Sequence, residues 1–261
     1  MADPSVPLIR QRRRLAATLA ALEPKQWATP SRCAGWSVQD VLAHLVGVNH
    51  FWAASIRAGR AGAPTRYLLE FDPVTTPPLL IEPLRSLAPA AVLDQFVEGV
   101  DDLADALDGV DGEAWSILAE SPPGHVDLRA LTLHALWDGW VHERDVLLPL
   151  GMTPVVVDDE VTASLMYAAV LGPTIWAASG HTTHGALAVQ CDDPTFCFVV
   201  EAGTTVVARL PGPDDRDLPE LCGSAVSLVE GLSARIPLRH RLAADDQWLV
   251  NGVSELFDPA G

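Results

Sequence analysis

One stretch of the chain carries several metal-capable side chains at helical spacing. His134, Asp138 and His142 follow one another at intervals of four residues, and Asp145 comes three residues later. Residues three or four apart lie on the same face of an α-helix, so these side chains share one stripe. Imidazole and carboxylate groups are ligands for zinc and for other divalent first-row metals. The spacing therefore indicates a metal site on this helix.

A second interpretation of the stripe needs no metal. A histidine among Leu, Val and Trp residues can be a core residue that is hydrogen-bonded to a neighbour. Several buried polar groups on one face all need partners, because an unpaired buried polar group is unfavourable. A shared metal satisfies them together, whereas hydrogen bonds satisfy them in pairs. Spacing alone leaves both interpretations open.

The stripe lies on a helix that we predict over residues 127–148. Asp127 follows a Pro-Pro-Gly break and is a typical N-cap. Pro149 and Gly151 are typical of the far end of a helix. Amphipathic patterns predict four further helices, at residues 6–22, 37–57, 89–108 and 158–178.

The pattern of hydrophobic residues changes after Gly180. Short β-type runs separated by turn residues follow, at residues 186–190, 196–200 and 204–209. Beyond them, residues 221–232 read as a helix and residues 248–252 as a strand before a last short helix. We therefore predict a helical bundle over residues 1–180, without strand pairs, and a small α+β domain over residues 181–261.

Composition limits the classes of function. The chain has 261 residues, of which 49% are hydrophobic and 20% charged, which is typical of a globular protein. A net charge of −17 argues against nucleic acid and anionic membrane surfaces as partners. We find no run of about 20 apolar residues that would span a membrane. Four cysteines without a Cys-x-x-Cys pair indicate reduced thiols in the cytoplasm, and a nucleophilic role for Cys33 is not favoured.

Two segments together carry a family resemblance. Residues 34–47 read Ala-Gly-Trp-Ser-Val-Gln-Asp-Val-Leu-Ala-His-Leu-Val-Gly, and residues 141–151 begin Val-His-Glu-Arg-Asp and end in Gly. Both are similar to signatures of the mycothiol-dependent maleylpyruvate isomerase-like family, within the DinB-like metalloenzyme superfamily. The resemblance covers nearly the whole chain. It implies an N-terminal DinB-like four-helix bundle followed by a small C-terminal α+β domain of sterol-carrier-like fold.

The resemblance also implies a set of metal ligands. In that family the metal is held by the histidine of the first segment and by an acid and a histidine spaced i, i+4 on the second helix. Carried over, these are His44, Asp138 and His142. Asp138 stands where the family usually has Glu, which is one methylene longer. His134, one turn earlier, is an alternative third ligand.

Further residues are expected to support the site. Asp40 and Asp145 suit carboxylates that orient the two ligand histidines, and Asp145 is our predicted catalytic carboxylate. Glu143 is adjacent to a ligand histidine and is expected to point into solvent. Arg235 lies in a segment that resembles a Gly-Arg-x-Pro motif of the family. It suits a substrate or thiol carboxylate, which makes it a predicted catalytic and cofactor-binding residue, with a surface ion pair as the alternative.

The resemblance implies a reaction class. Three protein ligands on a divalent metal, with zinc favoured, leave a position for a thiol, whose thiolate the cation stabilises. The implied protein is a cytoplasmic isomerase or S-transferase, monomeric or homodimeric, that uses mycothiol or a similar thiol on a small electrophile. Two alternatives remain. One is a thiol-independent, metal-dependent tailoring enzyme or hydrolase. The other is a non-catalytic binding or regulatory protein with a decayed site.

Overall fold

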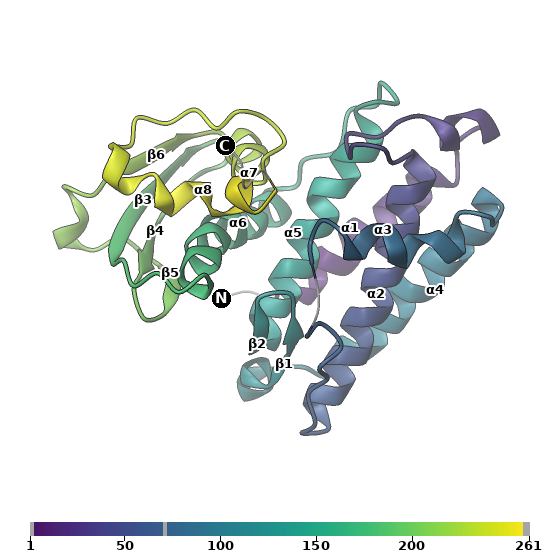
Figure 1. Cartoon of the computed structure of the whole chain (residues 1–261), viewed down its shortest axis with the longest axis horizontal. Helices are drawn as coiled ribbons and strands as arrows, with labels where there is room; N and C mark the ends of the chain where they lie inside the picture. The colour runs from purple at the N-terminus through teal and green to yellow at the C-terminus, as the bar shows by residue number, and fades with distance from the viewer. Residues whose placement is uncertain (1–2, 70–71, 258–261) are drawn as a thin grey trace. The chain divides into compact units, whose positions relative to one another are not determined.

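The computed structural model describes residues 3–69 and 72–257 of the chain (Figure 1). Its internal contacts divide the chain into two compact units, Met1–Val156 and Val157–Gly261. The helix at residues 158–178 therefore packs with the second unit, whereas the start of the short β-type runs led us to place a boundary near residue 180. The hydrophobic pattern shows where strands begin, but packing decides which core a helix joins.

Four long helices make up most of the first unit: α1 (Ser5–Leu19), α2 (Val38–Arg60), α4 (Pro89–Leu107) and α5 (Leu128–Leu147). Helices α1 and α2 each contact both α4 and α5, so the four close into a bundle (Figure 1). Burying a large apolar side chain contributes roughly 1.5–3 kcal/mol. The core is lined by buried apolar residues that include Leu15, Leu42, Leu45, Phe96, Val100 and Val146. The bundle confirms the fold class predicted for the N-terminal part.

The two helices predicted to carry metal ligands begin at capping residues. The Ser37 side chain accepts the backbone N–H of Asp40, and the Asp40 carboxylate accepts the N–H of Ser37 at 2.9 Å. Asp127 accepts the backbone N–H of Ala130 at 2.7 Å. These bonds satisfy N–H groups that have no partner within their own helix. The Asp127 cap confirms the sequence prediction, and the two caps fix where α2 and α5 start.

The prediction that the first part of the chain contains no strand pair is wrong. Strands β1 (Leu118–Ser121) and β2 (Gly124–Asp127) pair antiparallel just before α5. The intervening Pro-Pro turn ends at Gly124, whose φ of +116° favours glycine. The Pro-Pro-Gly break that marked the start of α5 in the sequence is thus also the turn of a hairpin.

The hairpin is held by α2 rather than by a strong strand pattern of its own. Strand β1 contacts α2. The Ser55 hydroxyl donates to the Glu120 carbonyl at 2.8 Å. A side chain at Gly59 would collide with the Leu118 carbonyl, so glycine permits the close approach. Four-residue strands are shorter than the most common length of about 5–6 residues, and this long-range packing was not visible in the local sequence.

The hairpin also anchors the segment that connects α2 to α4, which contains the short helices α3 (Thr76–Ile81) and η2 (Glu82–Leu84). The Glu120 side chain accepts the backbone N–H groups of Tyr67 and Leu68 at 2.7 and 2.8 Å. Glu120 is only 5% exposed. One buried carboxylate thus ties the start of this connection to β1.

We expect Glu120→Ala to lower the free energy of unfolding by about 1–3 kcal/mol, because two backbone donors lose their acceptor. Amide exchange at Tyr67 and Leu68 should accelerate in the same variant. Chemical denaturation and hydrogen exchange measure the two effects. Glu113→Ala is the matched control, since Glu113 is an exposed residue of η3 (Gly112–Ser116). Equal stability of the two variants would show that the carboxylate does not anchor the connection.

The second unit consists of one long helix, a mixed sheet and two further helices: α6 (Asp158–Ala178), β3 (Gly185–Asp192), β4 (Thr195–Ala202), β5 (Val206–Arg209), β6 (Glu220–Gly223), α7 (Ala225–Leu232) and α8 (Trp248–Phe257). The strand order is β5-β4-β3-β6, with β3 antiparallel to β4 and parallel to β6. Helix α6 contacts α7, α8, β4 and β5. Short 3-10 helices complete the chain: η1 (Pro24–Ala28), η4 (Pro213–Asp215) and η5 (Ala244–Asp246). Apart from α6, this unit has the mixed helix and strand content that was predicted for residues 181–261.

Two local predictions in this unit are wrong. Residues 248–252 were predicted as a strand but lie in α8. Residues 221–223 were predicted as the start of a helix but belong to β6, and the helix begins only at Ala225. Helix α8 packs closely on α6, since a side chain at Gly252 would collide with the backbone of Gly172. Tertiary packing, rather than the apolar run itself, decides the state of such short segments.

Helix α6 is the one helix among residues 3–69 and 72–257 that is long and apolar enough to cross a membrane. Half of its most apolar window is buried within the protein. It contacts two helices and two strands of its own unit, as the core helix of a soluble domain does.

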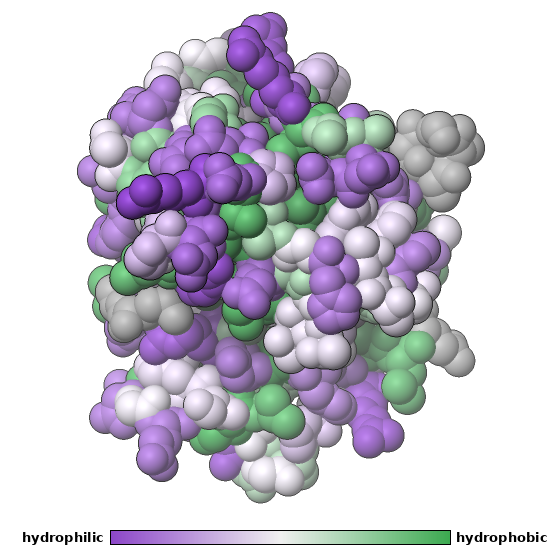
Figure 2. Space-filling model, turned by 90° about the vertical axis from the view of Figure 1, so that its left-hand side faces the viewer, coloured by the Kyte–Doolittle hydropathy of each residue, from purple (hydrophilic) through white to green (hydrophobic). Residues whose placement is uncertain are grey.

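On the face shown in Figure 2, hydrophilic and hydrophobic residues are interspersed.

Candidate metal centre

Three predicted ligands lie together where α2 and α5 pack. His44 comes from the second turn of α2, and Asp138 and His142 are one turn apart on α5. His142 Nε2 lies 3.4 Å and His44 Nε2 lies 3.7 Å from the same oxygen, Asp138 Oδ1. These three donor atoms all lie within 4.8 Å of one another. The bundle therefore brings two imidazoles and one carboxylate around a common point.

The cluster fits a divalent metal. A tetrahedral ion with bonds of about 2.0–2.1 Å separates neighbouring donors by roughly 3.3–3.4 Å, close to the spacing seen here. Asp138 Oδ2 is buried, makes no hydrogen bond and lies 3.6 Å from Arg12 Nη2, so Oδ1 is the oxygen of this carboxylate that is presented to a metal. The three side chains are 12–13% exposed, so the cluster is not sealed from solvent. The donor set of two nitrogens and one oxygen is one that zinc accepts.

The other nitrogen of His142 faces a second group of side chains. His142 Nδ1 lies 3.0 Å from Oδ2 of Asp145, which is fully buried. The Cys33 thiol lies 3.3 Å from the same oxygen, and Arg32 Nε lies 3.5 Å from Asp145 Oδ1. A histidine that binds metal through Nε2 commonly donates its Nδ1–H to a carboxylate, which fixes the ring. Asp145 is therefore placed to orient His142, and Cys33 adds a thiol to that contact.

The electrostatics of the cluster keep its acid ionised. Burial alone would raise the pKa of Asp138, but the adjacent His142 and His44 rings hold it well below its usual value. Burial lowers the pKa of His44, which outweighs the attraction of Asp138. Asp138 and Asp145 outweigh burial at His142, whose pKa lies well above its usual value. Asp138 is therefore an anion and His44 a neutral imidazole, the forms in which both groups bind metals.

His134 does not join the cluster. It is 9% exposed and lies between two tryptophans, with ring centroids 5.1 Å from Trp52 and 5.5 Å from Trp137. Burial lowers its pKa to about 4, so it is neutral. The donor groups found in the described part of the chain contain Asp138 and not His134. The geometry thus favours Asp138 as the third ligand.

The comparisons with known proteins place this site within a family. The model of the mycothiol maleylpyruvate isomerase N-terminal domain matches residues 8–147, which is more than half of the chain and includes all three donors. The chain belongs to this family. A search of curated proteins gives no match.

Solved structures of a family member share the fold. Crystal structures of the mycothiol-dependent maleylpyruvate isomerase and of a histidine-to-alanine mutant of it both match with a TM-score of 0.62. The sequence identities are 18% and 17%, and each match covers 89% of this chain and 88% of the other. At this identity the similarity shows the fold alone, and it confirms the predicted fold class.

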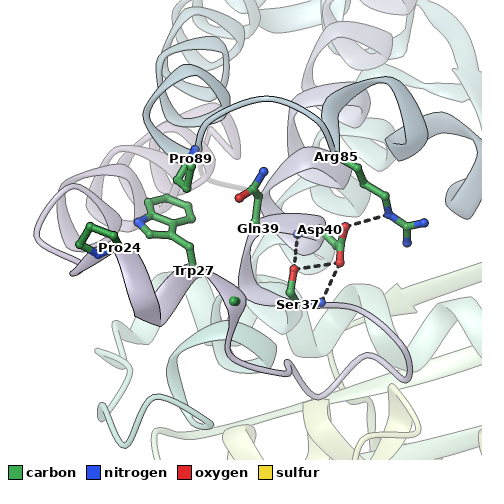
Figure 3. Close-up of a pocket in the computed structure, with 8 residues that line it drawn as sticks. Pro24, Trp27, Ser37, Gln39, Asp40, Arg85 and Pro89 are labelled. Carbon is green, nitrogen blue, oxygen red and sulfur yellow. Dashed lines mark hydrogen bonds and ion pairs between the residues drawn. The ribbon is translucent and has the colours of Figure 1, made fainter.

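Asp40, in the first signature of the family, does not have the role we predicted for it. It was expected to orient His44, but its carboxylate accepts from Ser37 and from Arg85 Nε, the latter at 3.0 Å (Figure 3). These groups line a surface pocket together with Trp27. As the third residue of α2, Asp40 turns back to cap the helix. Its role in the structure is to start α2, which carries His44.

Glu143, in the second signature, is buried rather than solvent-exposed, so that prediction is wrong. Its side chain is 1% exposed and lies 3.0 Å from Arg14 Nη2. Gln11 Nε2 also donates to it, at 3.2 Å. Helix α1 covers this side of α5, so a residue about 100° away from the ligand stripe meets a second helix instead of water.

Arg12 is a residue that sequence reasoning missed. It is fully buried, and its Nη2 lies 3.6 Å from Asp138 Oδ2. A signal was present, because Arg12 shares a helical face with buried leucines at positions 8, 15 and 19. An arginine on the apolar face of a helix indicates a buried ionic partner.

Arg235 belongs to the second unit. It follows α7, is half-buried, and its Nη1 lies 3.4 Å from the Ser233 carbonyl. Its assignment as a catalytic and cofactor-binding residue stays a prediction.

Proposed function

We propose that this protein is a metal-dependent enzyme that uses mycothiol or a similar low-molecular-weight thiol. The thiol would either isomerise a small electrophile or transfer its own sulfur to that electrophile. The observation that carries this proposal is the convergence of His44, Asp138 and His142 on one point, in a chain of the mycothiol maleylpyruvate isomerase family. We place the enzyme in the cytoplasm, as a monomer or homodimer with a small-molecule substrate. Nucleic acid and membranes are not proposed partners.

Each residue has a distinct task in the proposed site. A divalent cation, with zinc favoured, would stabilise the thiolate form of a bound thiol. His44, Asp138 and His142 would hold the cation through three donors, which leaves room for a further ligand such as a thiol. Asp145 holds Nδ1 of His142, which leaves Nε2 as the ring nitrogen that would face the cation. Arg235 is our candidate for binding a carboxylate of the substrate or the thiol.

The proposed reaction balances without any further reagent. The thiolate adds to one carbon of a C=C bond that is conjugated to a carbonyl, and the π electron pair moves to the carbonyl oxygen. The former double bond rotates, the C–S bond breaks, and the thiolate returns with the isomerised alkene. If the adduct instead takes a proton on carbon, the thioether is the product.

Thiol chemistry is favoured over water activation by the state of the nearby acids. Hydrolysis by a metal-bound water needs a general base within hydrogen-bonding reach. The two carboxylates that follow His142 on α5 are already engaged. Glu143 is paired with Arg14, and Asp145 with His142 and Arg32. Neither is placed as a free base.

The test is an assay of zinc-loaded protein on a cis alkene conjugated to carboxylates, with mycothiol, with a simple thiol surrogate, or without thiol. We expect turnover only when both metal and thiol are present. Turnover that needs metal but not thiol would instead support a tailoring enzyme or hydrolase. Failure of the wild-type protein to bind a divalent metal would support a non-catalytic protein with a decayed site.

A further inference from the structure

Asp138 presents its two oxygens to different partners. Oδ1 faces the Nε2 atoms of both ligand histidines, at 3.4 and 3.7 Å. Oδ2 lies 3.6 Å from Nη2 of the fully buried Arg12. A carboxylate can bind a metal through one oxygen or through both, and its outer oxygen is commonly held by a second residue. Arg12 occupies the position of that second residue.

Arg12 is held in place by three helices. Its Nε donates to Asn49 Oδ1 of α2 at 3.2 Å, and its Nη2 donates to the Ala135 carbonyl of α5 at 3.0 Å. Its Nη1 donates to Gln11 of α1, its own helix, at 3.3 Å. Helices α2 and α5 are the two that supply the donors of the cluster. The Arg12 guanidinium is therefore bonded to both α2 and α5, the two helices whose packing sets the distances between the proposed ligands.

The neighbouring residue on α5 makes room for this side chain. A side chain at Gly139 would collide with the guanidinium of Arg12 and would come close to Gln11. Glycine inside a helix is unfavourable by about 1 kcal/mol relative to alanine in general, so it needs a compensating reason. Here the reason is the space that the buried arginine occupies.

We propose that Arg12 is a positioning residue for the metal site. The Arg12 guanidinium holds Oδ2 of Asp138, so that only Oδ1 serves as a metal ligand. This rests on the proposed function, because it assumes the metal of that site. Single-oxygen binding keeps a coordination position open for the thiol. The planar guanidinium suits the task, because it can hold several acceptors in fixed directions.

An opposing effect has to be weighed. The positive charge of Arg12 disfavours a second cation nearby. That charge is offset by two buried carboxylates, Asp138 and Glu143, which both act on it electrostatically. We therefore expect the loss of position to outweigh the relief of repulsion when Arg12 is removed.

The test compares Arg12→Met with wild type by chelator competition for Zn²⁺ and by the visible spectrum of the Co²⁺-loaded protein. We expect Arg12→Met to bind Zn²⁺ about 10–100-fold more weakly. Its Co²⁺ bands should weaken as Oδ2 joins the coordination sphere and the coordination number rises. Arg14→Met is the matched control. It removes an arginine of the same helix that is paired with buried Glu143 and not with a proposed ligand, and we expect unchanged affinity and spectrum.

The outcomes separate this inference from the proposed function. Wild-type protein that binds no divalent metal would overturn both. Metal-binding wild type together with an Arg12→Met variant of equal or tighter affinity and unchanged Co²⁺ spectrum would overturn the inference alone. If Arg12→Met does not fold, Arg12→Lys retains the charge but cannot hold the same acceptors. We then expect a several-fold loss of affinity and an altered spectrum, and wild-type values would overturn the inference.

Discussion

His142→Ala will leave the purified protein with almost no bound metal and without thiol-dependent turnover. His142 faces Asp138 through Nε2 and is oriented by Asp145 through Nδ1, so its removal takes away one of three donors. Loss of a residue that only orients a ligand typically costs 10–100-fold in metal affinity, so loss of the ligand itself should exceed about 100-fold. Elemental analysis after zinc loading and dialysis measures the metal per chain.

His134→Ala is the matched control for this experiment. It removes another buried histidine of the same helix, two turns away, that packs between Trp52 and Trp137 outside the donor cluster. We expect this variant to retain its metal. If it loses metal as fully as His142→Ala does, the third ligand is His134 rather than Asp138.

Gly139→Ala will destabilise the first unit by about 3 kcal/mol or more, because the new methyl group would displace the fully buried guanidinium of Arg12 from its partners. A buried charge that loses its partners carries a penalty of this order. Chemical denaturation monitored by tryptophan fluorescence measures the change in free energy of unfolding.

Gly47→Ala provides the control for Gly139→Ala. Gly47 lies inside α2, and a side chain there would meet nothing within 4 Å. The same substitution should therefore stabilise the protein by up to about 1 kcal/mol through helix propensity alone. A Gly139→Ala variant as stable as Gly47→Ala would mean that Arg12 can move away at little cost.

Local sequence signals located the helices that position the site. Ser37 and Asp127 cap α2 and α5 where the sequence predicted helices to begin, because a cap depends only on residues within one turn. The spacing of Asp138 and His142 placed both on one face for the same reason. The family resemblance, rather than spacing, supplied His44 from another helix, and the bundle brings it to the same point.

The predictions that failed depended on partners far away in the chain. Glu143 was expected in solvent because the sequence of its own helix could not reveal that α1 covers it. Asp40 was predicted to orient His44, but its carboxylate caps the start of α2. Strand β1 depends on packing against α2, and α8 depends on a close approach to α6. Arg12 was overlooked because it lies 126 residues before its partner, Asp138.

Adding mycothiol, or a simple thiol surrogate, to the Co²⁺-substituted protein tests the central claim most directly. If the cluster of His44, Asp138 and His142 holds a metal that binds the thiol, an intense sulfur-to-cobalt charge-transfer band should develop and saturate at one thiol per metal ion. The same titration of His142→Ala should give no band. A wild-type protein that retains Co²⁺ but whose spectrum is unaffected by thiol would contradict the proposed chemistry.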